Sequence, residues 1–204
     1  MERRKIILFA FYNRTVTVVA QELLGKYLVR IVDDQPIVGI INETEAYDGS
    51  QDLACHARVG KTNRNAVMFG SAGHAYVYFT YGMHWCLNVV TGEINYPAAV
   101  LIRSIIPVEG LSVIAQNREN VPTKNWTNGP AKLTQALGIN KFQNGIDLTK
   151  KDNNLWIEEG MIIEENLVKT SPRIGIANTP EPWRSMPWRY YFNSNQIYLK
   201  GDVS

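Results

Sequence analysis

The chain has 204 residues, of which 45% are hydrophobic, and its 21 Lys and Arg against 19 Asp and Glu give a formal charge of +2. This length is enough for one substantial core and does not require two domains, so we expect one compact domain. No run of about 18 apolar residues occurs, so the sequence predicts no membrane-spanning helix. An evenly spread charge of this size would attract a polyanion only weakly.

Two features of the sequence favour a cytoplasmic location. Met1 to Lys5 are basic, as at the start of a signal peptide, but the apolar stretch after them ends by Tyr12 without a small-residue cleavage site. The two cysteines, Cys55 and Cys86, are too few for a disulfide framework in a chain of this size, which fits a reducing compartment.

Basic and acidic residues are unevenly distributed along the chain. From Leu53 to Gly92 there is no Asp or Glu, whereas Arg58, Lys61, Arg64 and all three histidines lie in this stretch. Such asymmetry suits a protein that offers one basic face to a phosphate backbone. A solvated surface loop would carry the same charges, so this feature alone leaves both interpretations open.

The first elements are predicted from the spacing of apolar residues. Residues 16–24 have apolar side chains at helical intervals and predict an amphipathic helix. Residues 26–32 and 37–42 are β-rich, and the polar residues between them predict a hairpin turn. Residues 48–73 show little periodicity and are expected to form a long loop, which in a compact domain is usually functional.

The second of these strands leads into Glu43, Glu45 and Tyr47. Alternate residues of a strand share a face, so Glu45 and Tyr47 are expected to point into one pocket. A turn follows at once, and a carboxylate at a strand end beside a loop is where catalytic side chains are commonly presented.

The next strands are predicted at 75–81 and 86–90, with a hairpin tip from Tyr81 to His84. Tyr81 and Met83 would be exposed at this tip, which is unusual because apolar groups normally stay in the core. Further strands are predicted from β-rich runs at Ala98 to Ile106, Arg173 to Ala177, Trp188 to Phe192 and Gln196 to Leu199.

Two helices are predicted in the second half of the chain. Pro107 is expected to open the first, which would run to about Asn117. The second would cover 131–137, with Asn128 as its cap. Free amides at the start of this helix, with Lys132 one turn in, could hold a phosphate, although an ordinary capped helix has the same sequence pattern.

Three interpretations compete for the polar and aromatic residues between Glu45 and Arg103. The first is a metal site made of Cys55, His56, His84 and Cys86, although zinc sites favour spaced pairs rather than adjacent or alternate ligands. The second is structural: the tyrosines fill the core, the histidines form hydrogen bonds, and Arg103 pairs with a carboxylate.

The third interpretation is a site for a flat aromatic ligand joined to phosphate. Tyr47, Tyr76 and Tyr78 would offer stacking faces. Tyr81 or Met83 would wedge between stacked bases. Glu45 would be the base that activates a water molecule.

Three long blocks of sequence are more specific than any of these patterns. They are Glu43-Thr44-Glu45-Ala46-Tyr47 with Ala54-Cys55-His56; Arg64-Asn65 through Met68-Phe69-Gly70 and Tyr76-Val77-Tyr78 to Tyr81-Gly82-Met83-His84 and Asn88; and Asn128-Gly129-Pro130-Ala131-Lys132-Leu133 with Ala136-Leu137-Gly138-Ile139. Together they resemble the 3-methyladenine DNA glycosylase family of the alkyladenine type, also called methylpurine DNA glycosylase. The likeness extends from about Phe9 to Tyr191.

The resemblance implies a mixed α/β (α+β) fold, with one glycosylase domain over residues 1–204 and a curved antiparallel β-sheet surrounded by helices. It implies a monomer that acts without metal or cofactor, in the cytoplasm and on the nucleoid. The partner would be duplex DNA containing damaged purines, such as 3-methyladenine or 7-methylguanine. The enzyme would flip the damaged base out of the duplex, hydrolyse its N-glycosidic bond and leave an abasic site for base excision repair. Whether hypoxanthine and ethenoadenine are accepted stays open.

The resemblance also implies roles by position. Glu45 resembles the general base, and Arg103 and the carbonyl of Ile174 would help to hold the attacking water. The residues resembling the base pocket are Tyr47, His56, Tyr78 and Asn88, with Asn88 expected to clash with the 2-amino group of guanine. The residues expected to contact DNA are Tyr81, Met83, Arg64 and Lys132.

Two other functions remain open at this stage. A non-catalytic nucleic-acid-binding module on the same scaffold would use the basic stretch and exposed aromatics but would not need Glu45. An enzyme acting on free nucleosides would use the aromatic pocket but not the hairpin wedge. The sequence has no lysine beside Glu45 and no proline at the N-terminus, so we expect water to be the nucleophile and no lyase activity.

Overall fold

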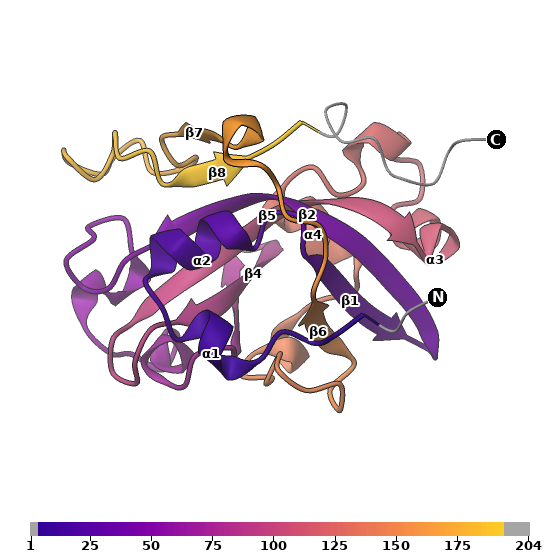
Figure 1. Cartoon of the computed structure of the whole chain (residues 1–204), viewed down its shortest axis with the longest axis horizontal. Helices are drawn as coiled ribbons and strands as arrows, with labels where there is room; N and C mark the ends of the chain where they lie inside the picture. Colours follow the sequence, from indigo (N-terminus) through magenta and orange to yellow (C-terminus); the bar gives the residue numbers. More distant parts are fainter. Residues whose placement is uncertain (1–3, 194–204) are drawn as a thin grey trace.

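The structure is a computed structural model, and it describes residues 4–193 (Figure 1). Its strands are β1 (Tyr27–Val32), β2 (Gln35–Tyr47), β3 (Ala75–Thr80), β4 (His84–Thr91), β5 (Ala98–Glu109), β6 (Leu155–Glu158), β7 (Lys169–Ser171) and β8 (Arg189–Tyr191). Its α-helices are α1 (Phe9–Tyr12), α2 (Val16–Glu22), α3 (Leu111–Asn117) and α4 (Pro130–Ala136). Two short 3-10 helices, η1 (His56–Val59) and η2 (Ala66–Phe69), lie in the loop after β2.

All eight strands belong to one antiparallel sheet in the order β3-β4-β5-β2-β1-β6, with β8 also paired to β2 and β7 paired to β8. The predicted fold, a single α+β domain built on a curved antiparallel sheet, is confirmed. The long strands β2 and β5 arch across the molecule in Figure 1, and their register shifts near Val38, Ile41 and Glu43. Such irregularities bend a strand and strengthen its twist.

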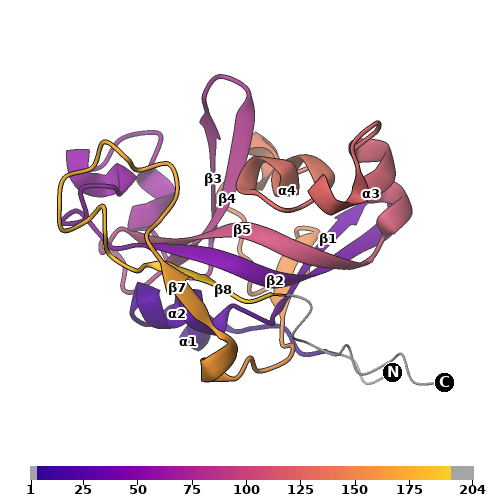
Figure 2. The ribbon, with the colours of Figure 1, turned by 90° about the horizontal axis from the view of Figure 1, so that it is seen from above.

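Helices cover both faces of the sheet. Figure 2 shows α1 and α2 on one face, and α3, α4 and the β3–β4 hairpin projecting from the other. The predicted amphipathic helix forms α2, because Val19 and Ala20 are fully buried and pack into the main core. Its contact with the sheet is fixed by Thr44 of β2, whose hydroxyl donates a 2.7 Å hydrogen bond to the Ala20 carbonyl.

The β1–β2 hairpin forms as predicted. Its turn consists of Asp33 and Asp34 at φ +47° and +61°, and two positive φ angles are typical of the type I′ turn that matches strand twist. β1 pairs with β2 as far as Ile40. Further along, β8 pairs with the same edge of β2, from Glu43 to Glu45. The second half of β2 is therefore held between β5 and β8.

Two predicted elements were wrong. Pro107 continues β5 opposite Gly39, at a register shift where β4 no longer pairs with β5, so its missing N–H is tolerated. Helix α3 begins only at Leu111, after Gly110 at φ +76°. Residues 173–177, predicted as a strand, form bends and turns, because the Ile174 amide donates to a side chain instead of to a neighbouring strand.

Other predictions in the C-terminal third had mixed outcomes. The strand predicted at 188–192 is present as β8, whereas β6 and β7 were not predicted. The strand predicted at 196–199 lies outside the described residues. None of the helices within residues 4–193 combines the length and the apolar character needed to cross a membrane.

Candidate active site

A cavity of about 210 Å³ opens between the β3–β4 hairpin, the loop after β2 and residues 174–176. The predicted site residues that line it are Tyr47, His56, Tyr78, Tyr81, Asn88, Arg103 and Ile174. Tyr76, Met68 and Leu101 also contribute to its apolar walls. A concave pocket lined by aromatic and apolar side chains, with a few convergent polar groups, is the usual form of a ligand site.

Glu45 lies directly behind the wall of this cavity. Its side chain is fully buried, and its carboxylate accepts hydrogen bonds from the Tyr47 hydroxyl at 2.9 Å and the Ile174 backbone amide at 2.7 Å. Arg103 Nη1 lies 3.2 Å from the same Oε1 that accepts the amide. All three partners line the cavity, so they connect the carboxylate to the pocket.

The environment of Glu45 raises the pKa of its carboxyl above the ordinary value. Burial is the main cause, and the charge of Glu43 adds to it, whereas Arg103 and the bonds from Ile174 and Tyr47 act in the opposite direction. A carboxylate with a raised pKa is a stronger base than one in water, while its three donors fix its orientation.

Ile174 was singled out for its carbonyl, but the structure brings its amide to Glu45. Its side chain is exposed, whereas its backbone amide is bonded to the buried carboxylate. The carbonyl remains a candidate for holding water, since the amide is already committed to the carboxylate.

His56, Tyr76 and Tyr78 form an aromatic wall. The His56 and Tyr78 rings meet edge to face with centroids 4.5 Å apart, and His56 Nδ1 lies 3.0 Å from the Tyr76 hydroxyl. Burial lowers the pKa of His56 to about 4, and the charges of Arg64 and Arg58 contribute to the same effect. The imidazole is therefore neutral at neutral pH.

Two asparagines fix this wall, and only one of them was given a role from the sequence. Asn88 is buried on β4 and donates a 2.9 Å hydrogen bond from Nδ2 to the carbonyl of Tyr76, its cross-strand partner. Asn65 was not assigned a role, yet its buried side chain donates to the carbonyls of His56 at 3.0 Å and Gly60 at 2.9 Å. It thereby holds the loop that carries His56.

The hairpin tip has the geometry predicted for it. Tyr81 is 80% exposed and Met83 is 65% exposed, and positive φ angles at Tyr81 and Gly82 make the turn between β3 and β4. Tyr81 also contributes to the mouth of the cavity. Arg64 packs beside this hairpin, since its Nη2 donates to the Phe79 carbonyl at 3.0 Å and its guanidinium lies 5.4 Å from the Tyr78 ring centre.

Lys132 lies on α4, next to the cavity rather than in its wall. Its ammonium donates to the Asn128 side chain at 2.8 Å. Asn128 was wrongly predicted as the helix cap: Gly129 occupies that position, and the Asn128 oxygen is used by Lys132 instead. Pro130, in the first turn of α4, reaches the cavity.

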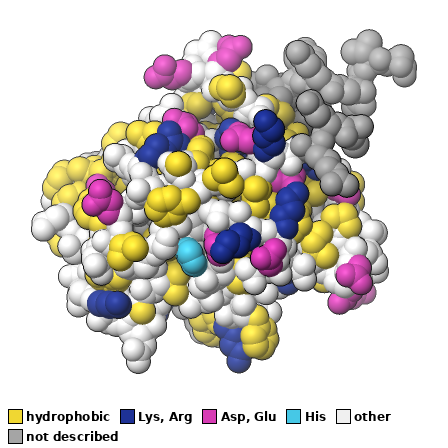
Figure 3. All heavy atoms as spheres, turned by 60° about the horizontal axis from the view of Figure 1, so that its bottom comes forward, with side chains coloured by type: hydrophobic (Ala, Val, Ile, Leu, Met, Phe, Trp, Pro, Cys, Tyr) yellow, Lys and Arg dark blue, Asp and Glu magenta, His cyan; other side chains and the backbone are white. Residues whose placement is uncertain are grey.

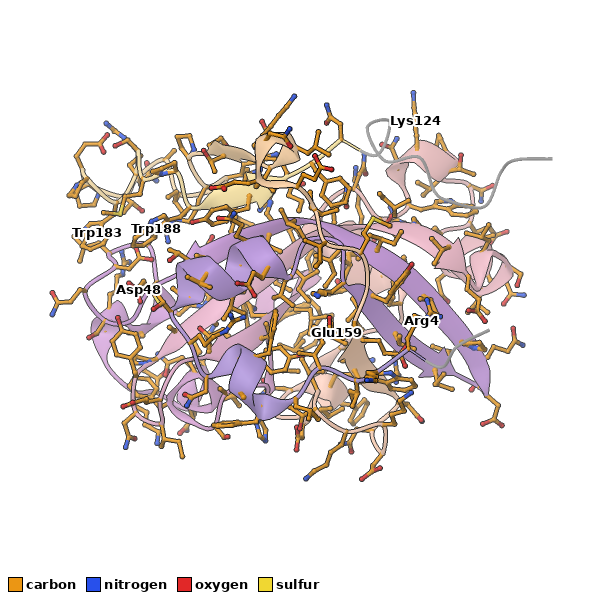
Figure 4. The ribbon with its side chains drawn as sticks, in the orientation of Figure 1. Arg4, Asp48, Lys124, Glu159, Trp183 and Trp188 are labelled. Atoms are coloured by element: carbon orange, nitrogen blue, oxygen red, sulfur yellow. The ribbon has the colours of Figure 1, made fainter. Side chains whose placement is uncertain are left out.

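A buried ion pair between Asp52 and Arg173 was missed by the sequence analysis. Both side chains are fully buried, and Arg173 also donates to the carbonyls of Ala46 at 2.9 Å and Trp183 at 3.1 Å. Its guanidinium lies 4.7 Å from the Tyr47 ring centre. Figure 4 shows Trp183 close to Trp188, on the segment that Arg173 ties to β2.

The residues of the metal interpretation do not gather into a ligand set. Among residues 4–193, no group of three or more His, Cys, Asp or Glu side chains could hold a metal ion. Burial raises the pKa of the Cys55 thiol to about 12, so this thiol is protonated at neutral pH. Its sulfur accepts a hydrogen bond from the Ala57 amide at 3.5 Å.

The chain is similar to known proteins over most of its length. Residues 10–196 match the methylpurine-DNA glycosylase family. A relative from Carboxydothermus hydrogenoformans is 47% identical over 93% of this chain and 96% of its own, and one from Prosthecochloris aestuarii is 44% identical over 93% and 89%. A third, from Francisella tularensis, is 42% identical over 89% and 92%. Each is named "Putative 3-methyladenine DNA glycosylase".

Proposed function

Because the chain belongs to the methylpurine-DNA glycosylase family, we propose that it excises damaged purines from duplex DNA by hydrolysis of the N-glycosidic bond. The substrates proposed are 3-methyladenine and 7-methylguanine, and the product is an abasic site. The observation that carries this proposal is the buried Glu45 carboxylate, held by three donors that all face an aromatic cavity.

The cavity is suited to a purine that has left the base stack. A base inside a duplex cannot be reached, so it must be extruded, at a cost of a few kcal/mol that is smaller when damage weakens its pairing. Tyr47, His56 and Tyr78 would hold the extruded ring. Alkylation at N3 or N7 makes the purine cationic, and aromatic faces attract a cation by about 0.5–2 kcal/mol.

Glu45 is proposed as the general base for the attacking water. It would take the proton of the water while its negative charge stabilises the cationic sugar of the transition state. Proton transfer of this kind typically contributes about 10² to 10⁴ in rate. Arg103 and the Ile174 carbonyl would position the water. No residue is needed as a covalent nucleophile, so the reaction would stop at the abasic site.

The exposed hairpin and the basic residues around it would bind the DNA. Tyr81 would fill the gap left by the extruded base, with Met83 beside it, and Arg64 and Lys132 would contact phosphates. Arg58, Lys61 and Arg64 have no acidic residue near them in sequence. The face shown in Figure 3, by contrast, carries Lys and Arg intermixed with Asp and Glu.

The decisive experiment is single-turnover release of base from a labelled duplex containing one N7-methylguanine or one hypoxanthine, with alkali to reveal abasic sites. Wild type, Glu45→Gln and the control Glu119→Gln, which changes an exposed carboxylate, would be compared. We expect release by wild type and Glu119→Gln, and loss of release by Glu45→Gln with DNA binding retained.

Other outcomes would point to different functions. Full excision by Glu45→Gln would contradict the role of Glu45. Tight binding by wild type with no release from either duplex would favour the non-catalytic binding module. Release of base from a free nucleoside, unaffected by excess undamaged DNA, would favour an enzyme of free nucleosides. A protein–DNA adduct trapped by borohydride would contradict the absence of lyase activity.

A further inference from the structure

We infer that Glu43 and Arg189 form a positioning pair that directs Arg103 toward Glu45 and sets how strongly its charge stabilises that carboxylate. The inference rests on the proposed function, since it assumes that Glu45 is the base. Neither residue lines the cavity, so the pair would act through Arg103 and not on the substrate.

Arg103 is shared between two carboxylates. Its Nε lies 2.7 Å from Glu43 Oε1, whereas its Nη1 lies 3.2 Å from Glu45 Oε1. The closer contact is therefore with Glu43, the residue outside the cavity. Because a guanidinium is planar and rigid, a bond that fixes Nε also fixes the direction in which Nη1 points.

Arg189 of the neighbouring strand β8 binds the Glu43 carboxylate. Its Nε lies 2.6 Å from the same Oε1 of Glu43, and its Nη1 donates to the Ser171 hydroxyl at 2.9 Å. Its guanidinium also lies 4.4 Å from the Tyr191 ring centre. β8 lies directly beside β2 here, as Figure 1 shows, and pairs Arg189 with Glu45. One oxygen of Glu43 thus joins two arginines from two different strands.

The charges of this cluster balance. Glu43 and Glu45 carry two negative charges, and Arg103 and Arg189 carry two positive charges. Coulombic attraction to Arg103 lowers the pKa of Glu45, whereas the charge of Glu43 raises it. Glu43 therefore offsets part of the effect of the arginine that it orients, which leaves Glu45 both well aligned and basic.

The other groups that face Glu45 do not supply a competing charge at neutral pH. Tyr47 on β2, Tyr78 on β3 and Cys86 on β4 all have pKa values raised mainly by burial, so they stay protonated and neutral. Arg173 is paired with Asp52 and acts on Tyr47. The charge next to Glu45 is thus set by Arg103, Glu43 and, behind them, Arg189.

Two variants shift this balance in opposite directions. Glu43→Gln keeps a side-chain oxygen for both arginines but removes the negative charge, so Glu45 should be easier to ionise and a weaker base. Arg189→Gln removes a positive charge and leaves an excess of negative charge, so Glu45 should be harder to ionise. Arg184→Gln is the matched control, because it removes an exposed arginine from the neighbouring segment.

The test is the pH dependence of the single-turnover excision rate, measured on whichever lesion the wild type releases faster. We expect the acid limb to move to lower pH by about one unit in Glu43→Gln, the size expected of one nearby charge, with a lower plateau rate. In Arg189→Gln the limb should move to higher pH, and in Arg184→Gln it should not move.

Thermal melting of each variant separates these effects from loss of folding. The inference would be overturned if the variants had lower rates with unchanged pH midpoints. It would also be overturned if the pH–rate profiles of both variants matched that of the wild type, because the pair would then be only a structural contact. If Arg189→Gln did not fold, the isosteric Glu43→Gln would decide alone. Absence of release by the wild type would instead contradict the proposed function, so the two failures are distinguishable.

Discussion

Arg173 and Asp52 are separated by 121 residues in the chain, yet they form an ion pair in which neither side chain is exposed. The pair joins the segment before β8 to the loop after β2. Because Ile174 follows Arg173 directly, the pair also fixes the backbone amide that binds Glu45. A salt bridge whose two members do not line the cavity therefore anchors one of the three donors that hold Glu45.

Removal of one member of this pair should damage both folding and activity. Asp52→Asn leaves the Arg173 charge buried without a counter-charge, and losing one partner of a buried pair typically costs about 3–5 kcal/mol. We expect a loss toward that range in urea unfolding, together with slower excision by the fraction that stays folded. Asp152→Asn, which changes an exposed aspartate, is the control. Unchanged stability of Asp52→Asn would show that the pair contributes little.

Truncation of the hairpin tip should affect DNA binding and leave folding intact. Tyr81→Ala removes an exposed ring, and stacking against a base is worth about 1–3 kcal/mol by alanine substitution. We expect weaker binding to lesion-containing duplex and slower excision, measured by titration and single turnover, with little change in melting temperature. Phe142→Ala, which removes another exposed ring, should change neither binding nor excision. A large drop in melting temperature of Tyr81→Ala would contradict its position at a solvent-exposed tip.

Shortening of Asn88 should relax selection against normal guanine. Asn88→Ser removes the side chain expected to clash with the guanine 2-amino group, and it also removes the bond to the Tyr76 carbonyl. We expect measurable release of guanine from undamaged duplex and a stability loss of about 1 kcal/mol from the hydrogen bond. Asn153→Ser serves as the surface control. If Asn88→Ser discriminated against guanine as well as the wild type does, Asn88 would not be a determinant of specificity.

The stability contributed by His56 should depend on pH. Its pKa is lowered from 6.5 to about 4 in the folded protein, so between these values the unfolded chain binds more protons than the folded one. The free energy of unfolding should therefore fall as the pH drops through this window. His56→Gln lacks the titrating group, so the difference in stability between wild type and variant should shrink from pH 7 to pH 4. A constant difference in urea titrations would contradict the lowered pKa.

Local patterns predicted the parts of the fold that local interactions determine. The apolar spacing of α2, the turn at Asp33 and Asp34, and the exposed tip at Tyr81 all follow from the sequence of a few residues, and the structure confirms each. Alternation along β2 also placed Glu45 and Tyr47 on one face, and in the structure the Tyr47 hydroxyl donates a hydrogen bond to the Glu45 carboxylate.

Contacts between distant segments could not be predicted in this way. Residues 173–177 were predicted as a strand, but Arg173 and Ile174 use their polar groups on β2 and the loop after it. The position of Pro107 within β5 depends on a register shift against β2, which no short stretch of sequence encodes. The bond between Arg189 and Glu43 likewise requires the pairing of β8 with β2.

The bonds to Glu45 span very different lengths of chain: Tyr47 is two residues away, whereas Ile174 is 129 residues away. During synthesis the hairpin with Tyr81 emerges long before Ile174 does, and closing so long a loop delays the contact further. A chain that stops before residue 174 would thus contain the exposed hairpin without the backbone amide that binds Glu45. The set of donors that holds the Glu45 carboxylate is thus complete only after residue 174 has been synthesised, whereas the aromatic hairpin depends on residues made much earlier.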